Sequence, residues 1–132
     1  MVCPVTGHVA FSNDWHAPRA GGQIHEGNDV MAPRGTPVVA VVAGVVGVRF
    51  GARSGNAVWF SGDDGNAYFY AHFEWPPAVP DGAHVHRGDV IGYVGNSGDA
   101  AGGPTHTHFE IHPHHGDPIN PYPTLLVICP DR

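Results

Sequence analysis

Residues 104–112 read PTHTHFEIH, and this stretch predicts the fold. Successive side chains of a strand point to opposite faces, so His106 and His108 would project side by side. Phe109 and Ile111 would then take the other face, toward a core. On a helix the two histidines would diverge, and a proline at each end of the run argues against a helix. Two imidazoles on one strand face indicate either a metal site or a polar surface that is rich in histidine.

Further segments of the chain also resemble strands, because they are dense in valine or aromatic residues and are bounded by turn residues. They are PVVAVVAGVVGVRF (37–50), NAVWFS (56–61), NAYFYAH (66–72), VIGYVG (90–95) and LLVI (125–128). The sequence GDDG (62–65) between the second and third predicts a hairpin. We find no amphipathic helix pattern of ordinary length. The sequence therefore predicts an all-β fold: a small antiparallel sheet or sandwich with long loops, in a single domain over residues 1–132.

The composition excludes several classes of partner. The formal net charge is −6, all six cationic residues are arginines, and they form no cluster, so a nucleic-acid surface is not expected. No apolar stretch is long enough to span a bilayer. Residues 2–10 lack the pattern of a signal peptide, which suggests a mature domain or a domain excised from a longer secreted protein. The 11 histidines form an unusually large set of metal-binding and acid–base groups.

The two cysteines, Cys3 and Cys129, lie near opposite ends of the chain. They are too far apart in sequence for a C-x-x-C motif. They are either two separate buried thiols or a disulfide, and we favour a disulfide because the ends of compact domains often lie close together. Such a bond indicates an oxidising, extracytoplasmic location.

Candidate partners for the histidine pair occur upstream, where His25 is followed four residues later by Asp29. Gly27 between them lets the backbone turn sharply, so the two side chains can converge. With one histidine of the pair, they make the three-ligand set of a catalytic zinc site, which leaves a fourth position for water. The second histidine of the pair would lie beside the metal as a base. His72 ends a predicted strand, shares a face with Tyr70, and is by itself a weaker candidate.

Four motifs then occur in order along the chain. HEGNDVMAPRGTPV (25–38) is similar to H-x-G-x-D followed by A-P-x-G-T-P-V, and YAH (70–72) is similar to Y-x-H. VHRGDVIGYVGNSG (85–98) is similar to V-x-x-G-x-x-I-G-x-x-G-x-S/T-G, and HTHFE (106–110) to H-x-H-F-E. With all four motifs, the chain resembles the lysostaphin-type, LytM-like zinc metallopeptidases, which cleave peptides in bacterial cell walls.

The resemblance implies a role for five residues. His25, Asp29 and His108 would bind one Zn²⁺ per chain, and His72 and His106 would be catalytic histidines that do not bind the metal. The implied fold is a small antiparallel sheet of the duplicated-hairpin type, with an active-site groove walled by loops.

The implied function is hydrolysis of peptide bonds in peptidoglycan stems or cross-links by a secreted or wall-associated monomer. The bond that is cut depends on loop shape, mainly in 50–56, 73–83 and 97–105. Thr107 stands where the family commonly has leucine, and we expect little effect because threonine suits a strand.

Three other functions compete with this interpretation. The same fold can bind cell-wall peptide or activate an amidase without cutting, which the intact set of five residues argues against. A biotinyl or lipoyl carrier needs a lysine, and the chain has none. A structural zinc domain would use a fourth protein ligand, for which His106 is the obvious candidate.

Overall fold

The computed structural model describes residues 1–19, 22 and 24–132. Its strands are β1 (Asn28–Met31), β2 (Pro37–Val39), β3 (Gly44–Gly51), β4 (Gly55–Gly62), β5 (Ala67–Phe73), β6 (His84–Val85), β7 (Val90–Tyr93) and β8 (His106–His112). Its helices are the 3₁₀ turns η2 (Gly98–Ala100) and η3 (Pro113–His115) and the α-helix α1 (Tyr122–Ile128).

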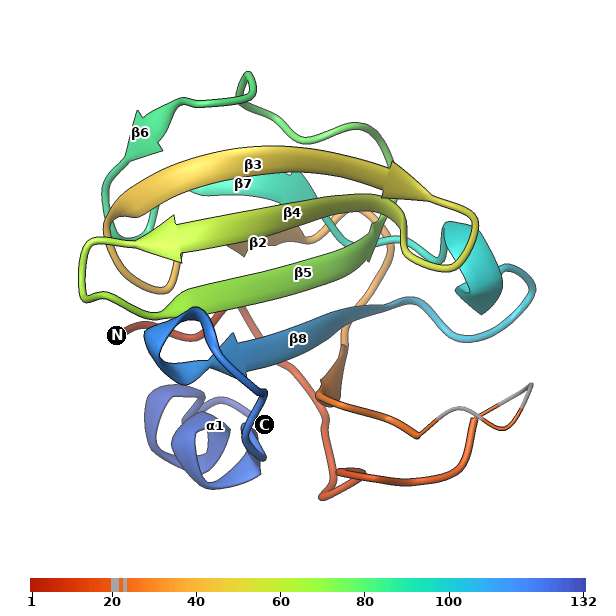
Figure 1. Cartoon of the computed structure of the whole chain (residues 1–132). Coiled ribbons are helices and arrows are strands. Elements are labelled where there is room, and N and C mark those ends of the chain that lie inside the picture. The colour runs from red at the N-terminus through yellow and green to blue at the C-terminus, as the bar shows by residue number, and fades with distance from the viewer. Residues whose placement is uncertain (20–21, 23) are drawn as a thin grey trace.

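A six-stranded sheet dominates the described part of the chain, in the order β1-β8-β5-β4-β3-β6 (Figure 1). Each pair of neighbours in it is antiparallel. β2 and β7 form a second, two-stranded antiparallel sheet. The predicted antiparallel all-β fold is confirmed, and the strand predicted at 106–112 has the predicted bounds.

The valine-rich run 37–50 divides into two strands that belong to different sheets. β2 pairs with β7, whereas β3 pairs with β4 and forms one long hairpin with it. Gly44 begins β3 where the backbone of β4 approaches closely, since an ideal Cβ there would lie 2.3 Å from the carbonyl oxygen of Ser61. The glycine therefore permits this close approach of the two strands.

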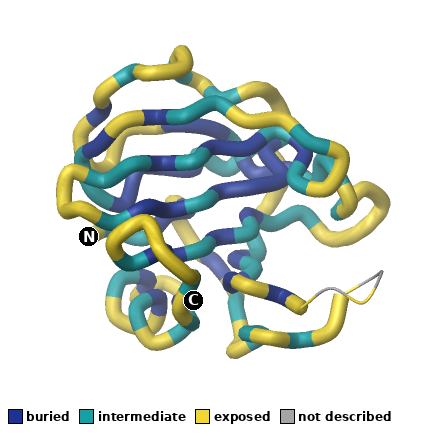
Figure 2. The backbone as a smooth tube through the Cα atoms, viewed as in Figure 1, coloured by how far each residue is buried: buried dark blue, intermediate teal, exposed yellow. Residues whose placement is uncertain are grey.

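The hydrophobic core lies between one face of the large sheet and the β2–β7 pair, and its residues appear as the dark blue segments of Figure 2. Phe60, Tyr70 and Phe109 are fully buried there. The hydroxyl of Tyr70 accepts a hydrogen bond from the backbone N–H of Val41 at 3.0 Å, so its polar atom has a partner in the core. On β8 the predicted core residues Phe109 and Ile111 are buried. Thr107, which lies between the two histidines on the same face as Phe109, is fully buried as well.

The strand predicted at 125–128 is wrong, because these residues form most of α1. Pro121 caps the helix and Pro123 lies in its first turn, where the missing N–H costs no hydrogen bond. Helical spacing turns Leu125 and Cys129 to the core together, whereas Val127, which a strand would bury with Leu125, is 80% exposed. α1 has seven residues, and in the described part of the chain no helix is long and apolar enough to cross a membrane.

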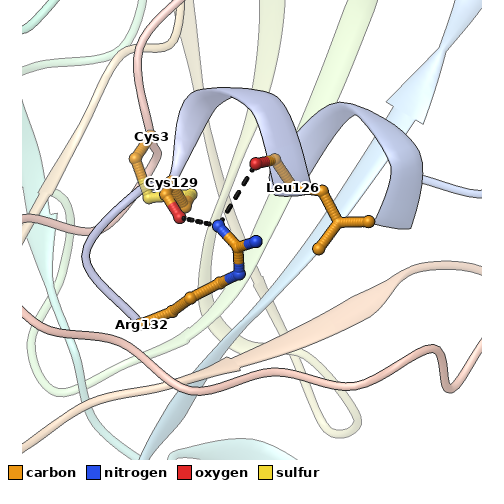
Figure 3. The surroundings of a disulfide bond; sticks show 4 residues. All are labelled: Cys3, Leu126, Cys129 and Arg132. Carbon is orange, nitrogen blue, oxygen red and sulfur yellow. Dashed lines mark hydrogen bonds between the residues drawn. A yellow bond between two sulfur atoms is a disulfide. The ribbon is translucent and has the colours of Figure 1, made fainter.

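A disulfide joins Cys3 to Cys129, as the sequence analysis favoured. It ties the N-terminal segment to the residue that follows α1 (Figure 3). Arg132 donates hydrogen bonds from Nη1 to the carbonyl oxygens of Cys129, at 2.8 Å, and Leu126, at 3.2 Å. The two ends of the chain are thereby held together beside the helix.

Candidate active site

Sheet register brings Asp29 and His108 together. β1 and β8 pair antiparallel with Asp29 directly opposite His108. Side chains of directly opposed residues share a face, and Oδ1 of Asp29 lies 3.3 Å from Nδ1 of His108. Thr107, Phe109 and Ile111 point to the core, so this pair stands on the outer face of the sheet.

His25 reaches the same point from the segment that precedes β1. Its Nε2 lies 2.9 Å from Oδ1 of Asp29 and 2.8 Å from Nδ1 of His108. Gly27 makes this approach possible, because an ideal Cβ there would lie 2.5 Å from the carbonyl oxygen of Phe109 and 2.9 Å from Cε1 of His108. The sequence analysis assigned Gly27 to a sharp turn, whereas here the glycine is needed for close passage over β8.

These three residues can hold a metal ion, since one ligand atom from each lies within 4.8 Å of the others. The far nitrogen of each histidine has its own acceptor. Nδ1 of His25 donates to the carbonyl oxygen of Asp14 at 3.2 Å, and Nε2 of His108 donates to Oε2 of Glu110 at 2.6 Å. When both rings are neutral, their lone pairs therefore face the Asp29 carboxylate at one point, where either a proton or a metal cation relieves the repulsion. The donor set is the one that zinc prefers.

The electrostatics of the cluster also favour positive charge at this point. Burial alone would lower the pKa of His25, but Asp14 and Asp29 raise it to about 9 through hydrogen bonds and charge attraction. Burial alone would raise the pKa of Asp29, but hydrogen bonds from His108 and His25 and the charge of His106 hold it well below its ordinary value. Protons and a metal cation therefore compete for the same position.

Asp14 and Arg19 also contact this cluster, and the sequence analysis missed both. Nη2 of Arg19 donates to Oδ2 of Asp29 at 3.3 Å, which leaves Oδ1 to face the histidines. Oδ2 of Asp14 accepts the backbone N–H of Asp29 at 3.3 Å. An acidic residue and an arginine shortly before His25 were the available signal, but neither has a spacing that points to a site.

His106 stands beside the cluster on the same face of β8. Its Nδ1 donates to the carbonyl oxygen of Pro104 at 3.0 Å, and its Nε2 lies 3.6 Å from Oδ1 of Asp29. His106 and His108 thus share one face, as their spacing predicted, but only His108 belongs to the group that can hold the metal.

His72 enters the site through an irregularity at the end of β5. Strand alternation would send it to the core with Tyr70, but its backbone has φ 71°, which turns the side chain to the outer face. Its Nδ1 donates to the carbonyl oxygen of Ser97 at 2.7 Å. Burial above all holds the pKa of His72 below its ordinary value of 6.5, with a further contribution from the charge of His106. The predicted shared face with Tyr70 is therefore wrong.

The site lies in a groove of about 750 Å³ over the outer face of the sheet. Phe69 and Ala71 of β5 form part of its floor. Its walls come from 24–26, from 53–54 at the β3–β4 turn and from 99–100 in η2. Two of the three loops expected to shape the groove do so, but among the described residues none from 73–83 lines it.

The remaining histidines separate into surface and buried groups. His84 and His86 are exposed with Val85 buried between them. His112 is followed by residues that favour an exposed loop, but it is the last residue of β8 and has only 8% of its surface exposed. Its Nε2 donates to Oε1 of Glu110 at 2.6 Å.

A cluster that can hold a metal ion beside two further histidines, in a groove on an antiparallel sheet, is typical of a metal-dependent hydrolase. Residues 23–121 match the family model described as Peptidase family M23. The chain belongs to this family.

Two curated relatives support this assignment. One is the "DD-carboxypeptidase/endopeptidase Mpg" of Neisseria meningitidis serogroup B, 36% identical over 107 residues, which are 79% of this chain and 23% of the relative. Another is the "L-Ala--D-Glu endopeptidase" of Bacillus subtilis, 33% identical in an alignment of 136 positions that covers 92% of this chain and 41% of the relative. The chain thus spans less than half the length of either relative.

Solved structures share the fold. A "putative glycyl-glycine endopeptidase lytM" from Ruminococcus gnavus has a TM-score of 0.85 and 27% identity, covering 99% of this chain and 61% of its own. A "zinc containing peptidase" from Vibrio cholerae has a TM-score of 0.72 and 27% identity, covering 89% of this chain and 37% of its own. The fold predicted from the sequence motifs is therefore confirmed, and so is the predicted family.

Proposed function

We propose that the chain is a zinc-dependent endopeptidase that hydrolyses peptide bonds in bacterial peptidoglycan. The observation that carries this proposal is the convergence of five side chains, from three separate segments, in one groove. His25, Asp29 and His108 would hold one zinc ion, and His72 and His106 would act beside it. Residues 1–132 would form one domain that works as a monomer.

Zinc fits the donor set better than Mg²⁺ or Ca²⁺, which prefer oxygen ligands. Two imidazoles and one carboxylate leave a coordination position open, as catalytic zinc sites require. The chemistry that zinc supplies when bound is activation of water and polarisation of the scissile carbonyl. The name of the Vibrio cholerae structure, a zinc-containing peptidase, agrees with this choice.

His72 and His106 would move the protons. Each ring gives its Nδ1–H to a backbone carbonyl, so Nε2 is the atom that can accept a proton from water. One of the two would take that proton and pass it to the leaving amine. The other would act as an imidazolium, which keeps its Nδ1–H on the backbone carbonyl and donates its Nε2–H to the oxyanion that forms at the carbonyl carbon. The geometry is similar for both rings, so an experiment is needed to decide which histidine is the base and which is the oxyanion donor.

The substrate is inferred from the relatives, which are named as a DD-carboxypeptidase/endopeptidase and an L-Ala–D-Glu endopeptidase, because peptides that contain D-amino acids are typical of peptidoglycan. An extracytoplasmic location fits both that substrate and the Cys3–Cys129 disulfide. The chain spans only part of each relative, so the activity proposed here is that of the domain.

The test is zinc content per chain together with release of soluble fragments from purified peptidoglycan, for wild type and His106→Ala. One zinc in both proteins, with fragments released only by wild type, supports the proposal. One zinc in both with no release by either, across walls of different cross-link type, favours a module that binds peptidoglycan without cutting it. His86→Ala is the matched control, because the His86 side chain is 86% exposed and contributes nothing to the groove.

A further inference from the structure

Four alternate residues of β8 share the outer face of the sheet, and three of them form a continuous chain of hydrogen bonds. The two carboxylate oxygens of Glu110 are both used. Oε2 accepts from Nε2 of His108, and Oε1 accepts from Nε2 of His112, each at 2.6 Å. His112 in turn donates from Nδ1 to the carbonyl oxygen of Gly116 at 2.8 Å. The His108–Glu110–His112 chain thus runs from the cluster to the backbone beyond the strand.

These three side chains are shielded from water. The side chains of His108, Glu110 and His112 are 12%, 15% and 11% exposed. Trp59 packs against His112 with ring centroids 4.9 Å apart, and Phe69 packs edge-on against His108. Charge-assisted hydrogen bonds in such surroundings are stronger than exposed ones, and they hold their members in one geometry.

The far end of the chain is also fixed. Gly116 follows η3, and its own N–H donates to the carbonyl oxygen of Pro113 at 2.9 Å. The backbone N–H of His114 donates to the side-chain oxygen of Asn66 at 3.0 Å, which ties this turn to the β4–β5 hairpin. The acceptor for His112 is therefore presented by a tight turn that is anchored to the sheet.

We propose that Glu110 is a positioning residue that fixes His108 for metal binding, and that His112 holds Glu110 in place. This inference rests on the proposed function, because it takes Nδ1 of His108 as the atom that binds zinc. A carboxylate that accepts a hydrogen bond from Nε2–H keeps the proton on that nitrogen and orients the ring. The lone pair of Nδ1 is then available for zinc. His112 prevents Glu110 from rotating away, since it occupies the second carboxylate oxygen.

The test is the zinc affinity of purified variants, measured by competition with a chelator. Glu110→Gln keeps the shape of the side chain but loses the charge and one acceptor oxygen, and we expect about 10- to 100-fold weaker zinc binding. His112→Phe should weaken zinc binding less, because Glu110 can still reach His108. His112→Gln, which keeps a donor, should recover part of the loss and provides a second variant if phenylalanine disturbs folding.

A double-variant cycle separates positioning from a general effect on the fold. If His112 acts through Glu110, His112→Phe should cost no further zinc affinity in a Glu110→Gln background. The matched control is His84→Phe, because His84 makes a similar 2.8 Å contact with the Asp63 carboxylate, away from the groove. This variant should bind zinc as wild type does.

The outcomes distinguish the inference from the proposed function. If wild type binds zinc and Glu110→Gln binds it equally well, the inference is wrong and the proposed function stands. If His112→Phe weakens zinc binding as much in the Glu110→Gln background as in wild type, then His112 does not act through Glu110. That result contradicts the second part of the inference. If wild type fails to bind zinc at all, both the proposed function and this inference are overturned.

Discussion

The rings of His72 and His106 lie edge to face in the groove, with their centroids 5.1 Å apart. Each ring donates its Nδ1–H to a backbone carbonyl, that of Ser97 or that of Pro104. The connection between β7 and β8 contains both Ser97 and Pro104, so one loop orients both imidazoles in the same way, although the two histidines come from different strands. The arrangement prepares two Nε2 atoms for proton transfer and oxyanion stabilisation beside one metal position.

We therefore predict that His72→Ala and His106→Ala each lower kcat by about 10²- to 10⁴-fold, the usual contribution of general acid–base catalysis. Both variants should keep their zinc, because neither residue belongs to the cluster that can hold it. The double variant should lose little more than the worse single variant, since the two histidines act in one proton-transfer sequence. Steady-state kinetics on a soluble wall peptide, with zinc content measured in parallel, checks this. A single variant with wild-type kcat would remove that histidine from the mechanism.

Local sequence pattern was sufficient to predict the part of the site that lies on regular strands. Alternation placed His106 and His108 on one face of β8, and the structure has them there. Asp29 joins them because β1 pairs with β8 in one particular register, which no local pattern specifies. His72 could not be placed at all from alternation, because a single left-handed residue reverses the face to which it points.

Long-range packing explains the remaining errors. The run LLVI has strand propensity, but it is flanked by prolines that suit a helix start, and only a helix buries both Leu125 and Cys129. The burial of His112 was not predicted, because prolines and histidines that are typical of a loop follow it. Its burial depends on Glu110 and on Trp59, which comes from a strand far away in sequence. Strand propensity cannot reveal contacts with residues that are distant in the sequence.

The close approach at Gly27 yields a prediction about metal binding. Gly27→Ala should weaken zinc binding, because the new Cβ would have to displace the His108 ring or the backbone of β8. We expect a loss of at least about tenfold, comparable with loss of a residue that orients a ligand. Gly51→Ala is the control, since its Cβ would meet only the side-chain oxygen of Ser54, at 3.2 Å. Equal zinc affinities for both variants would contradict this prediction, because the segment at Gly27 could then shift away from β8 without disturbing the zinc ligands.

The disulfide yields a prediction about stability alone. Replacing both Cys3 and Cys129 by serine should lower the free energy of unfolding by about 2–5 kcal/mol, because the bond closes a loop across a sequence separation of 126 residues. Zinc affinity at a temperature where the variant is folded should not change, since neither cysteine lines the groove. Denaturant unfolding monitored by tryptophan fluorescence measures the first quantity, and chelator competition measures the second. A loss of zinc affinity in the folded variant would mean that the chain ends are coupled to the site.

Zinc binding should release protons and should weaken as the pH falls. Without metal, Asp14 and Asp29 raise the pKa of His25 to about 9, from an ordinary value of 6.5, so at pH 7 this imidazole carries a proton that zinc must displace. The raised pKa stabilises the metal-free fold fully below pH 6.5, and that stabilisation is lost as the pH rises through 9. Calorimetric titrations with zinc at pH 7, in two buffers of different ionisation enthalpy, should give a release of about one proton or more. Release should decrease toward pH 10, where His25 is already neutral. Zinc binding with no proton release at pH 7 would show that His25 does not bind the metal or is neutral before the metal arrives.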